Sequence, residues 1–291
     1  MTLAQVVLEL TLVVTTMLVA ATLVFVGPRR LVAAVRGYRW RLEACLLPIA
    51  ALGVVLALRW STRDVVLRLE RRVIGHNITH TLFALEQRLL GETPVVFLQS
   101  IQTETLTEFF VFIYIYGYAF LLLFPIIAYF ALEEMEELST LLLAFAANYG
   151  IGLLCYILFI AYGPRNFDPL LFEPLLYDAF PQSRTLTNQV NQNTNVFPSL
   201  HTSLSMTVFF LAWLTRDRYP LWVPLSGFLA VSVALSTMYL GIHWFLDVVA
   251  GTVLALVSVY IGVNYTVDGI VSTGRRHLSR RFARIGRPGD D

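Results

Sequence analysis

Seven long runs of apolar residues constrain this chain more than any other feature. They cover residues 3–26, 42–60, 109–130, 138–162, 199–214, 221–240 and 243–264. A helix needs about 20 mainly apolar residues to cross the hydrocarbon core of a bilayer. Hydrophobic residues make up 57% of the chain and charged residues only 14%, whereas soluble domains are about a quarter charged. The sequence therefore predicts an all-α, polytopic transmembrane helix bundle.

Arginines orient the predicted spans, because basic residues collect in cytoplasmic loops. The basic residues are all arginine, and three clusters of them fall between or after spans: Arg29, Arg30, Arg36, Arg39 and Arg41; Arg216 and Arg218; and Arg275, Arg276, Arg280, Arg281, Arg284 and Arg287. With seven spans these clusters share one side, which we assign as cytoplasmic. We therefore expect a multi-pass protein of the cell membrane, with segment 163–197 and the turn before residue 243 facing the exterior. The first apolar run lacks a basic leader, so we expect it to remain as an uncleaved span.

The chain divides into three parts. Residues 1–108 hold the first spans and segment 61–90, which alternates apolar and charged residues at helical spacing and is expected to lie along the membrane surface. Residues 109–264 form the membrane core that carries the motifs below, and residues 265–291 form a basic cytoplasmic tail. The formal net charge of +1 argues against a nucleic-acid partner.

A histidine and an aspartate stand four residues apart at the start of the last apolar run, at His243 and Asp247. Positions four apart share one face of a helix, so the carboxylate can accept a hydrogen bond from one imidazole nitrogen. This contact would orient the ring and raise its basicity, as in a serine protease triad. A purely structural His–Asp pair at a span end is the alternative interpretation.

A second histidine, His201, opens the fifth apolar run directly after Pro198-Ser199-Leu200. Proline suits a first helical turn, and the free backbone amides of such a turn form an anion site. Ser199 and Ser203 add hydroxyl groups. A histidine beside an anion-binding turn is well placed to protonate a leaving oxygen.

Arg165 ends the fourth apolar run on the same predicted side of the membrane. Guanidinium groups bind phosphate oxygens bidentately and keep their charge. A lone arginine at a span end is more often an interfacial anchor. Here, however, three span ends would deliver Arg165, His201 and His243 to one exterior-facing pocket.

These motifs resemble those of the membrane phosphatidate phosphatase type 2 superfamily, which also includes lipid phosphate phosphatases and vanadium haloperoxidases. Its signatures are Lys, six residues, Arg-Pro; then Pro-Ser-x-His; then Ser-Arg, five residues, His, three residues, Asp. The chain matches the second signature at Pro198–His201 and the third in its spacing at Ser236, His243 and Asp247. The resemblance covers roughly residues 109–264 and implies a six-span phosphatase-type core preceded by one extra N-terminal span.

Two cations of the family pattern are missing. Leu158 stands where the first signature has lysine, and Thr237 stands where the third has arginine, while Gly163-Pro164-Arg165 only approximates Arg-Pro. These departures and the segment Phe197-Pro198-Ser199-Leu200-His201-Thr202-Ser203 resemble most the branch that contains inositol phosphorylceramide synthases. Arg184 or backbone amides are candidate replacements for the missing charge.

The resemblance implies a role for each matched residue. His243 would attack phosphorus and form a phosphohistidine, with Asp247 orienting it, and His201 would protonate the departing alcohol. Arg165, Ser199 and Ser236 would hold the phosphoryl oxygens. We expect no cofactor and no metal, because the histidines already have roles and no Asp/Glu cluster of metal-ligand spacing accompanies them. His76 and His80, four residues apart, are read as surface-helix residues, since no third ligand lies near them.

The sequence thus predicts metal-independent hydrolysis of a phosphoester or pyrophosphate on a lipid phosphate, at the exterior membrane surface. The expected partners are the lipid phosphate substrate and the membrane lipids. Transfer of the phospho-head-group to an alcohol acceptor is the nearest alternative. A transporter that binds an anionic substrate without reacting is a third, but it gives no reason for Asp247 or for Pro198-Ser199.

Overall fold

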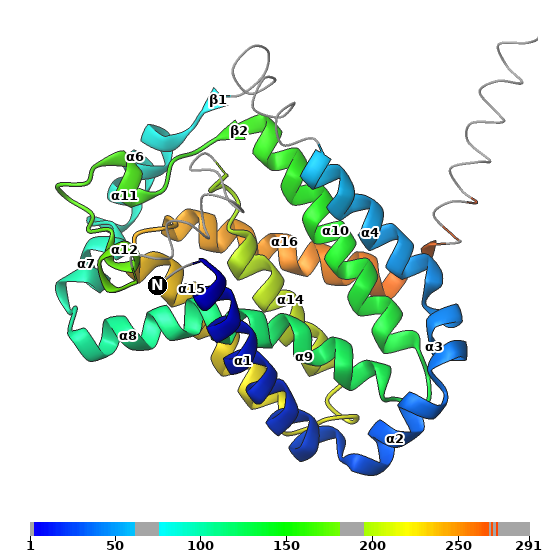
Figure 1. Cartoon of the computed structure of the whole chain (residues 1–291). Helices are drawn as coiled ribbons and strands as arrows, with labels where there is room; N and C mark the ends of the chain where they lie inside the picture. Colours follow the sequence, from blue (N-terminus) through cyan, green and yellow to red (C-terminus); the bar gives the residue numbers. More distant parts are fainter. Residues whose placement is uncertain (1–2, 62–75, 181–194, 268, 270–271, 273–291) are drawn as a thin grey trace, which may run out of the picture.

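A computed structural model describes residues 3–61, 76–180, 195–267, 269 and 272. Within these ranges the chain is a bundle of long helices with one very small sheet (Figure 1). Inside a bilayer the backbone polar groups must be satisfied within the protein, which a helix does by itself. The predicted all-α transmembrane bundle is confirmed.

Each predicted apolar run lies on a helix. The N-terminal run forms α1 (Leu3–Ala21) and a π-helical turn, η1 (Thr22–Val26); the second run lies on α3 (Tyr38–Ala44) and α4 (Leu46–Ser61), which follow the short α2 (Pro28–Arg36). The third is one continuous helix, α8 (Glu104–Phe112), η2 (Ile113–Gly117) and α9 (Tyr118–Phe130). The last four are α10 (Glu136–Leu158), α14 (Leu200–Leu214), α15 (Trp222–Tyr239) and α16 (Phe245–Asn264).

Not every one of these helices is long enough to cross a membrane by itself. Among the described residues, five helices have the necessary length and apolar character, and a sixth span is counted if α3 and α4, bent by 63°, are taken together. Helix α14 has only 15 residues. These apolar helices indicate an integral membrane protein.

Helix α14 packs on α10, α15 and α16, and α10 also packs on α16, while α4 lies along the outer side of α10 (Figure 1). Large buried side chains fill the space between them, including Phe124, Leu141, Leu204 and Trp222. Small residues allow the closest approaches. A Cβ atom at Gly251 of α16 would lie 2.5 Å from the carbonyl oxygen of Ser199, so only glycine allows α16 to pack there against the start of α14.

Shorter elements cover one end of the bundle (Figure 1). They are α6 (Thr79–Leu90), α7 (Pro94–Ser100), α11 (Pro164–Phe167), α12 (Leu175–Ala179), and the parallel strands β1 (His76–Asn77) and β2 (Phe159–Ile160). The fourth predicted run, 138–162, therefore ends early, because the chain becomes extended at Phe159 to pair with β1.

The amphipathic segment 61–90 is only partly within the described residues, since 62–75 lie outside them. Its second half, α6, also packs against the helix bundle. Leu82 and Glu86 are buried, and Glu86 contacts the first turn of α16. The candidate residue Arg184 and the basic tail beyond residue 272 also lie outside the described residues.

Candidate active site

His243 is held in a tight turn between α15 and α16. The backbone N–H of His243 donates to the carbonyl of Thr237 (3.0 Å), and the turn passes through Gly241 at a φ of +68°, in the left-handed region that favours glycine. Helix α16 begins only at Phe245. His243 therefore precedes the helix, although its spacing to Asp247 predicted that both residues share one helix face.

Asp247 lies behind His243 even so. Its Oδ2 is 3.5 Å from His243 Nδ1 and also accepts a hydrogen bond from the backbone N–H of Trp244 (2.8 Å). Asp247 Oδ1 and His243 Nδ1 are buried without a hydrogen-bond partner among the described residues. The carboxylate thus both caps α16 and lies beside the histidine.

The Pro-Ser-Leu-His segment docks directly on this turn. The backbone N–H of Ser199 donates to the carbonyl of Asp247 (3.0 Å), which joins the start of α14 to the start of α16. The Ser199 hydroxyl is the N-cap of α14 and accepts from the backbone N–H of Thr202 (3.3 Å). As a result the rings of His201 and His243 lie next to each other in an edge-to-face arrangement, with centroids 5.9 Å apart.

Two tyrosines hold the ring of His201. Tyr114 lies in η2 and Tyr118 one turn later at the start of α9, and their ring centroids are 4.9 Å and 4.8 Å from that of His201. No motif in the sequence connects these aromatic residues with the site. Their contact restricts the orientation of the imidazole.

Arg165 reaches the same turn from α11. Its backbone N–H donates to the carbonyl of Gly241 (3.0 Å), and its Nη2 donates to the Tyr177 hydroxyl (2.9 Å). Its Nε and Nη1 are buried and have no partner among the described residues. Unpaired buried donors of this kind are costly unless a ligand satisfies them, so the guanidinium is suited to an anion.

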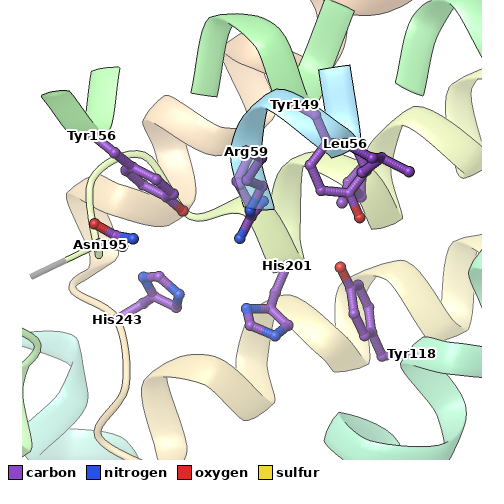
Figure 2. A pocket seen from close by; sticks show the side chains of 10 residues that line it. Leu56, Arg59, Tyr118, Tyr149, Tyr156, Asn195, His201 and His243 are labelled. Atoms are coloured by element: carbon purple, nitrogen blue, oxygen red, sulfur yellow. The ribbon is translucent and has the colours of Figure 1, made fainter. Parts of the chain in front are cut away.

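A cavity of about 300 Å³ contains both histidines (Figure 2). Its walls come from α4, α9, α10, α14, the chain before α14 and the 240–244 turn. The lining residues are Leu56, Arg59, Tyr118, Tyr149, Tyr156, Asn195, Leu200, His201, Leu204 and His243. Arg165, Ser199 and Asp247 support this lining from behind and do not form part of it.

Three residues considered from the sequence are engaged elsewhere. Ser236 is fully buried, and its hydroxyl donates to the Val233 carbonyl of its own helix (2.7 Å). The Thr237 hydroxyl likewise donates to the Ala234 carbonyl (2.7 Å). The Ser203 hydroxyl donates to Asn148 Oδ1 of α10 (2.9 Å). The cavity is thus formed without Ser236, and its phosphate-binding role remains a prediction.

Two ionisable residues near the site, Arg59 and Glu86, belong to none of the motifs found in the sequence. Arg59, in the last turn of α4, lines the cavity, and its guanidinium points toward the gap between the two histidine rings (Figure 2). Glu86 is fully buried, and its Oε1 accepts from the backbone N–H of Leu246 (2.9 Å). An ionisable residue at the end of an apolar run was the available signal for Arg59.

Burial determines the charge of His243. Its side chain is almost completely buried, and desolvation lowers its pKa to about 3, with Arg165 adding to the effect and the Val196 backbone opposing it. The imidazole is therefore neutral at pH 7. A neutral histidine has a free lone pair and can act as a base or a nucleophile.

A family model for the PAP2 superfamily matches residues 80–261, which is more than half of the chain. The chain belongs to the PAP2 superfamily. Comparisons with curated proteins and with solved structures gave no match. The match supports the resemblance at the superfamily level, and it leaves the assignment to the inositol phosphorylceramide synthase-like branch as a prediction.

PAP2 proteins are phosphatases or phosphotransferases, so membership indicates chemistry of that type. The matched residues include every segment that forms the His201–His243 pair, but they exclude α4 and Arg59. Within the described part of this PAP2 chain, no group of three or more His, Cys, Asp or Glu side chains has the arrangement of a metal site. Metal independence stays a prediction that a chelator can test.

Proposed function

We propose that this PAP2 protein hydrolyses a lipid phosphate or pyrophosphate, without a metal, through a phosphohistidine at His243. The observation that carries the proposal is the neutral, buried His243 facing His201 across one cavity, with the Asp247 carboxylate behind it. A structural His–Asp pair would not require a second histidine at 5.9 Å or unpaired arginine donors nearby.

In the first step the His243 nitrogen that does not face Asp247 attacks phosphorus. An N–P bond forms as the bond to the leaving oxygen breaks, and that oxygen takes a proton from His201. Asp247 stabilises the positive charge that develops on the imidazole. The amides at the start of α14, and the positive charge of Arg165 close to but outside the cavity lining, would stabilise the negative oxygens of the transferring group.

In the second step a water molecule gives a proton to His201 and attacks the phosphohistidine. The N–P bond breaks, phosphate leaves, and His243 returns to its neutral state. If an alcohol takes the place of water, the same steps give a phosphotransferase. Two observations favour this second candidate. The cations are missing at Leu158 and Thr237, and the segment Phe197–Ser203 resembles that of inositol phosphorylceramide synthases.

The test is turnover of a panel of lipid phosphates by purified protein in detergent, with and without added inositol or glycerol. We expect His243→Ala to lower turnover by roughly 1000-fold and Asp247→Asn by roughly 100-fold or more, since both act on the bond-making step. His76→Ala is the matched control, because His76 is exposed and lies outside the cavity. Activity is expected to survive a strong chelator.

The outcomes separate the candidates. Free phosphate that disappears in His243→Ala identifies a phosphatase, whereas a new phospholipid formed only with an added alcohol identifies a phosphotransferase. Near-normal turnover in a folded His243→Ala or Asp247→Asn protein would remove the proposed nucleophile or its orienting partner. Substrate binding without any turnover would instead support a transporter.

A further inference from the structure

The cavity has an unequal distribution of charge that the PAP2 motifs do not explain. Of its lining residues, Arg59 alone carries a permanent charge, since His243 is neutral and the other lining residues apart from His201 are tyrosine, asparagine and leucine. Arg165 does not line this space. A phosphate that enters the cavity therefore meets Arg59 as the cation on its wall.

We propose that Arg59 binds the phosphate oxygens of the substrate and thereby supplies a positive charge that Leu158 and Thr237 cannot provide. This inference rests on the proposed phosphoryl chemistry. It assigns a binding residue to α4, which lies outside residues 80–261, the part matched by the family model.

The surroundings of Arg59 fix its direction. Its guanidinium carbon lies 5.2 Å from the ring centroid of Tyr149, which holds it by a cation–π contact. Tyr149 and Tyr156 are two turns apart on α10, and the guanidinium emerges between them toward His201 and His243 (Figure 2). Among the described residues Arg59 has no carboxylate partner, so its N–H groups are available for an anion.

An interfacial anchor is the simplest alternative role for an arginine at the end of an apolar helix, because a long side chain can reach toward the lipid head groups. The next residue, Trp60, has the exposure expected of such an anchor, because it is 82% exposed. Arg59 instead points into the cavity beside the two histidines (Figure 2). Its direction favours a ligand over an anchor.

The same cavity indicates how the rest of the substrate lies. Leu56 stands one turn before Arg59, lines the cavity, and is 41% exposed on the outer side of α4. Leu200 and Leu204 add apolar wall on α14. A phosphate bound at Arg59 can therefore extend an apolar chain past Leu56 toward the lipid side, so the substrate class is a phosphate carried on an acyl or prenyl chain.

The first experiment compares Arg59→Gln with Arg88→Gln. Arg88 is exposed on α6 at the same end of the bundle and does not line the cavity, so both variants remove one positive charge from this end. We expect Arg59→Gln to lower kcat/KM for a lipid phosphate roughly 10- to 100-fold, as for loss of a charged hydrogen bond. Arg59→Lys should restore only part of the lost kcat/KM, because the lysine ammonium group lacks the planar fork that binds two phosphate oxygens at once.

A second measurement needs no variant and therefore does not depend on folding. Phenylglyoxal modifies accessible arginines, and mass spectrometry can follow each site in the purified protein. Inorganic phosphate is expected to slow the modification of Arg59 severalfold while that of Arg88 is unchanged. Equal rates with and without phosphate, or an Arg59→Gln protein that matches Arg88→Gln in kcat/KM, would overturn the role of Arg59.

The results distinguish this inference from the proposed function. If His243→Ala abolishes turnover but phosphate does not protect Arg59, only the inference fails. If phosphate protects Arg59 but no lipid phosphate is turned over, the binding role holds and the proposed catalysis fails. The chain specificity is tested with glycerol phosphate against its acylated form, where equal kcat/KM would contradict the apolar path past Leu56.

Discussion

At the scale of single residues, burial favours the uncharged form of two ionisable groups near the first turn of α16, the acid Glu86 and the base His243. Desolvation raises the pKa of Glu86 from 4.5 to about 7, although its hydrogen bond from Leu246 N–H opposes the rise and Asp247 adds to it. Desolvation lowers that of His243 to about 3. The dry interior that keeps the proposed nucleophile neutral therefore acts on its neighbour Glu86 in the opposite direction.

Glu86 makes the stability of the protein depend on pH. The folded protein keeps the Glu86 proton up to about pH 7, whereas the unfolded chain releases it near 4.5. The contribution of Glu86 is thus fully present below about pH 4.5, and the free energy of unfolding falls as pH rises from there to 7, by on the order of 3 kcal/mol. Glu86→Gln keeps an oxygen acceptor for Leu246 N–H and removes the ionisation.

We therefore expect the Tm of Glu86→Gln, measured in detergent, to rise relative to wild type between pH 5 and pH 8. His243 titrates with the opposite effect on stability, but it is present in both proteins and cancels in the difference. Glu92→Gln is the control, because Glu92 is exposed in the same part of the chain. A constant difference in Tm between Glu86→Gln and wild type across this pH range would rule out the buried proton.

Residue spacing predicted part of this site and could not predict the rest. The pattern His243–Asp247 and the Pro-Ser-x-His segment correctly indicated side chains that meet. Arg59 and Glu86 join them only through packing of α4 on α10 and of α6 on α16, and no local pattern encodes such distant contacts. Ser236 shows the opposite case, because a hydroxyl in a motif can be satisfied within its own helix.

At the scale of elements, the site depends on the docking of α11 against the 240–244 turn. Two hydrogen bonds join α11 and the residues just before it to this turn, from Arg165 N–H to the Gly241 carbonyl and from Trp244 Nε1 to the Tyr162 carbonyl (2.8 Å). Between these contacts a Cβ atom at Gly163 would overlap the carbonyl oxygen of Ile242. Glycine at 163 thus allows the two backbones to touch.

Gly163→Ala should push α11 away from the turn and displace both Arg165 and His243. We expect a loss of about 1–3 kcal/mol in stability and a fall in kcat/KM of roughly 10- to 100-fold, since small displacements of catalytic groups are costly. Gly150→Ala is the matched control, because a Cβ there has open space within α10. Tm and kcat/KM decide the prediction, and a Gly163→Ala protein equal to Gly150→Ala in both would contradict it.

The elements themselves followed from hydrophobicity, but their ends did not. Apolar runs locate the long helices because the membrane demands them. The bend between α3 and α4 and the early end of α10 at Leu158 depend on contacts made elsewhere. Arg41 donates to the carbonyls of Phe130 and Leu132 (both 3.0 Å), and β2 pairs with β1, so neither feature is visible in the local composition.

At the scale of the whole molecule, the two arginine clusters among the described residues, 29–41 and 216–218, lie at the opposite end of the bundle from the histidines. Arg41 binds the carbonyls that end α9, and Arg218 pairs with Glu134 (2.7 Å) and Glu137 (2.9 Å) in the next loop. The loop 131–137 and these described arginines therefore share one end, as the topology predicted from the sequence requires. In Figure 1 this is the end near α2, while α6, α11 and the small sheet lie at the other.

The positive-inside rule then predicts that the His201–His243 cavity faces the exterior. Single cysteines can test this in intact cells, in a Cys155→Ala background where Cys45 remains buried. Leu170→Cys, fully exposed between α11 and α12, should react with a membrane-impermeant maleimide before permeabilisation. Asp217→Cys, exposed beside Arg218, should react only afterwards. The reverse pattern would turn the cavity toward the cytoplasm, and the lipid phosphate would then have to come from the inner leaflet, because the exposed path past Leu56 opens at the same end as the histidines.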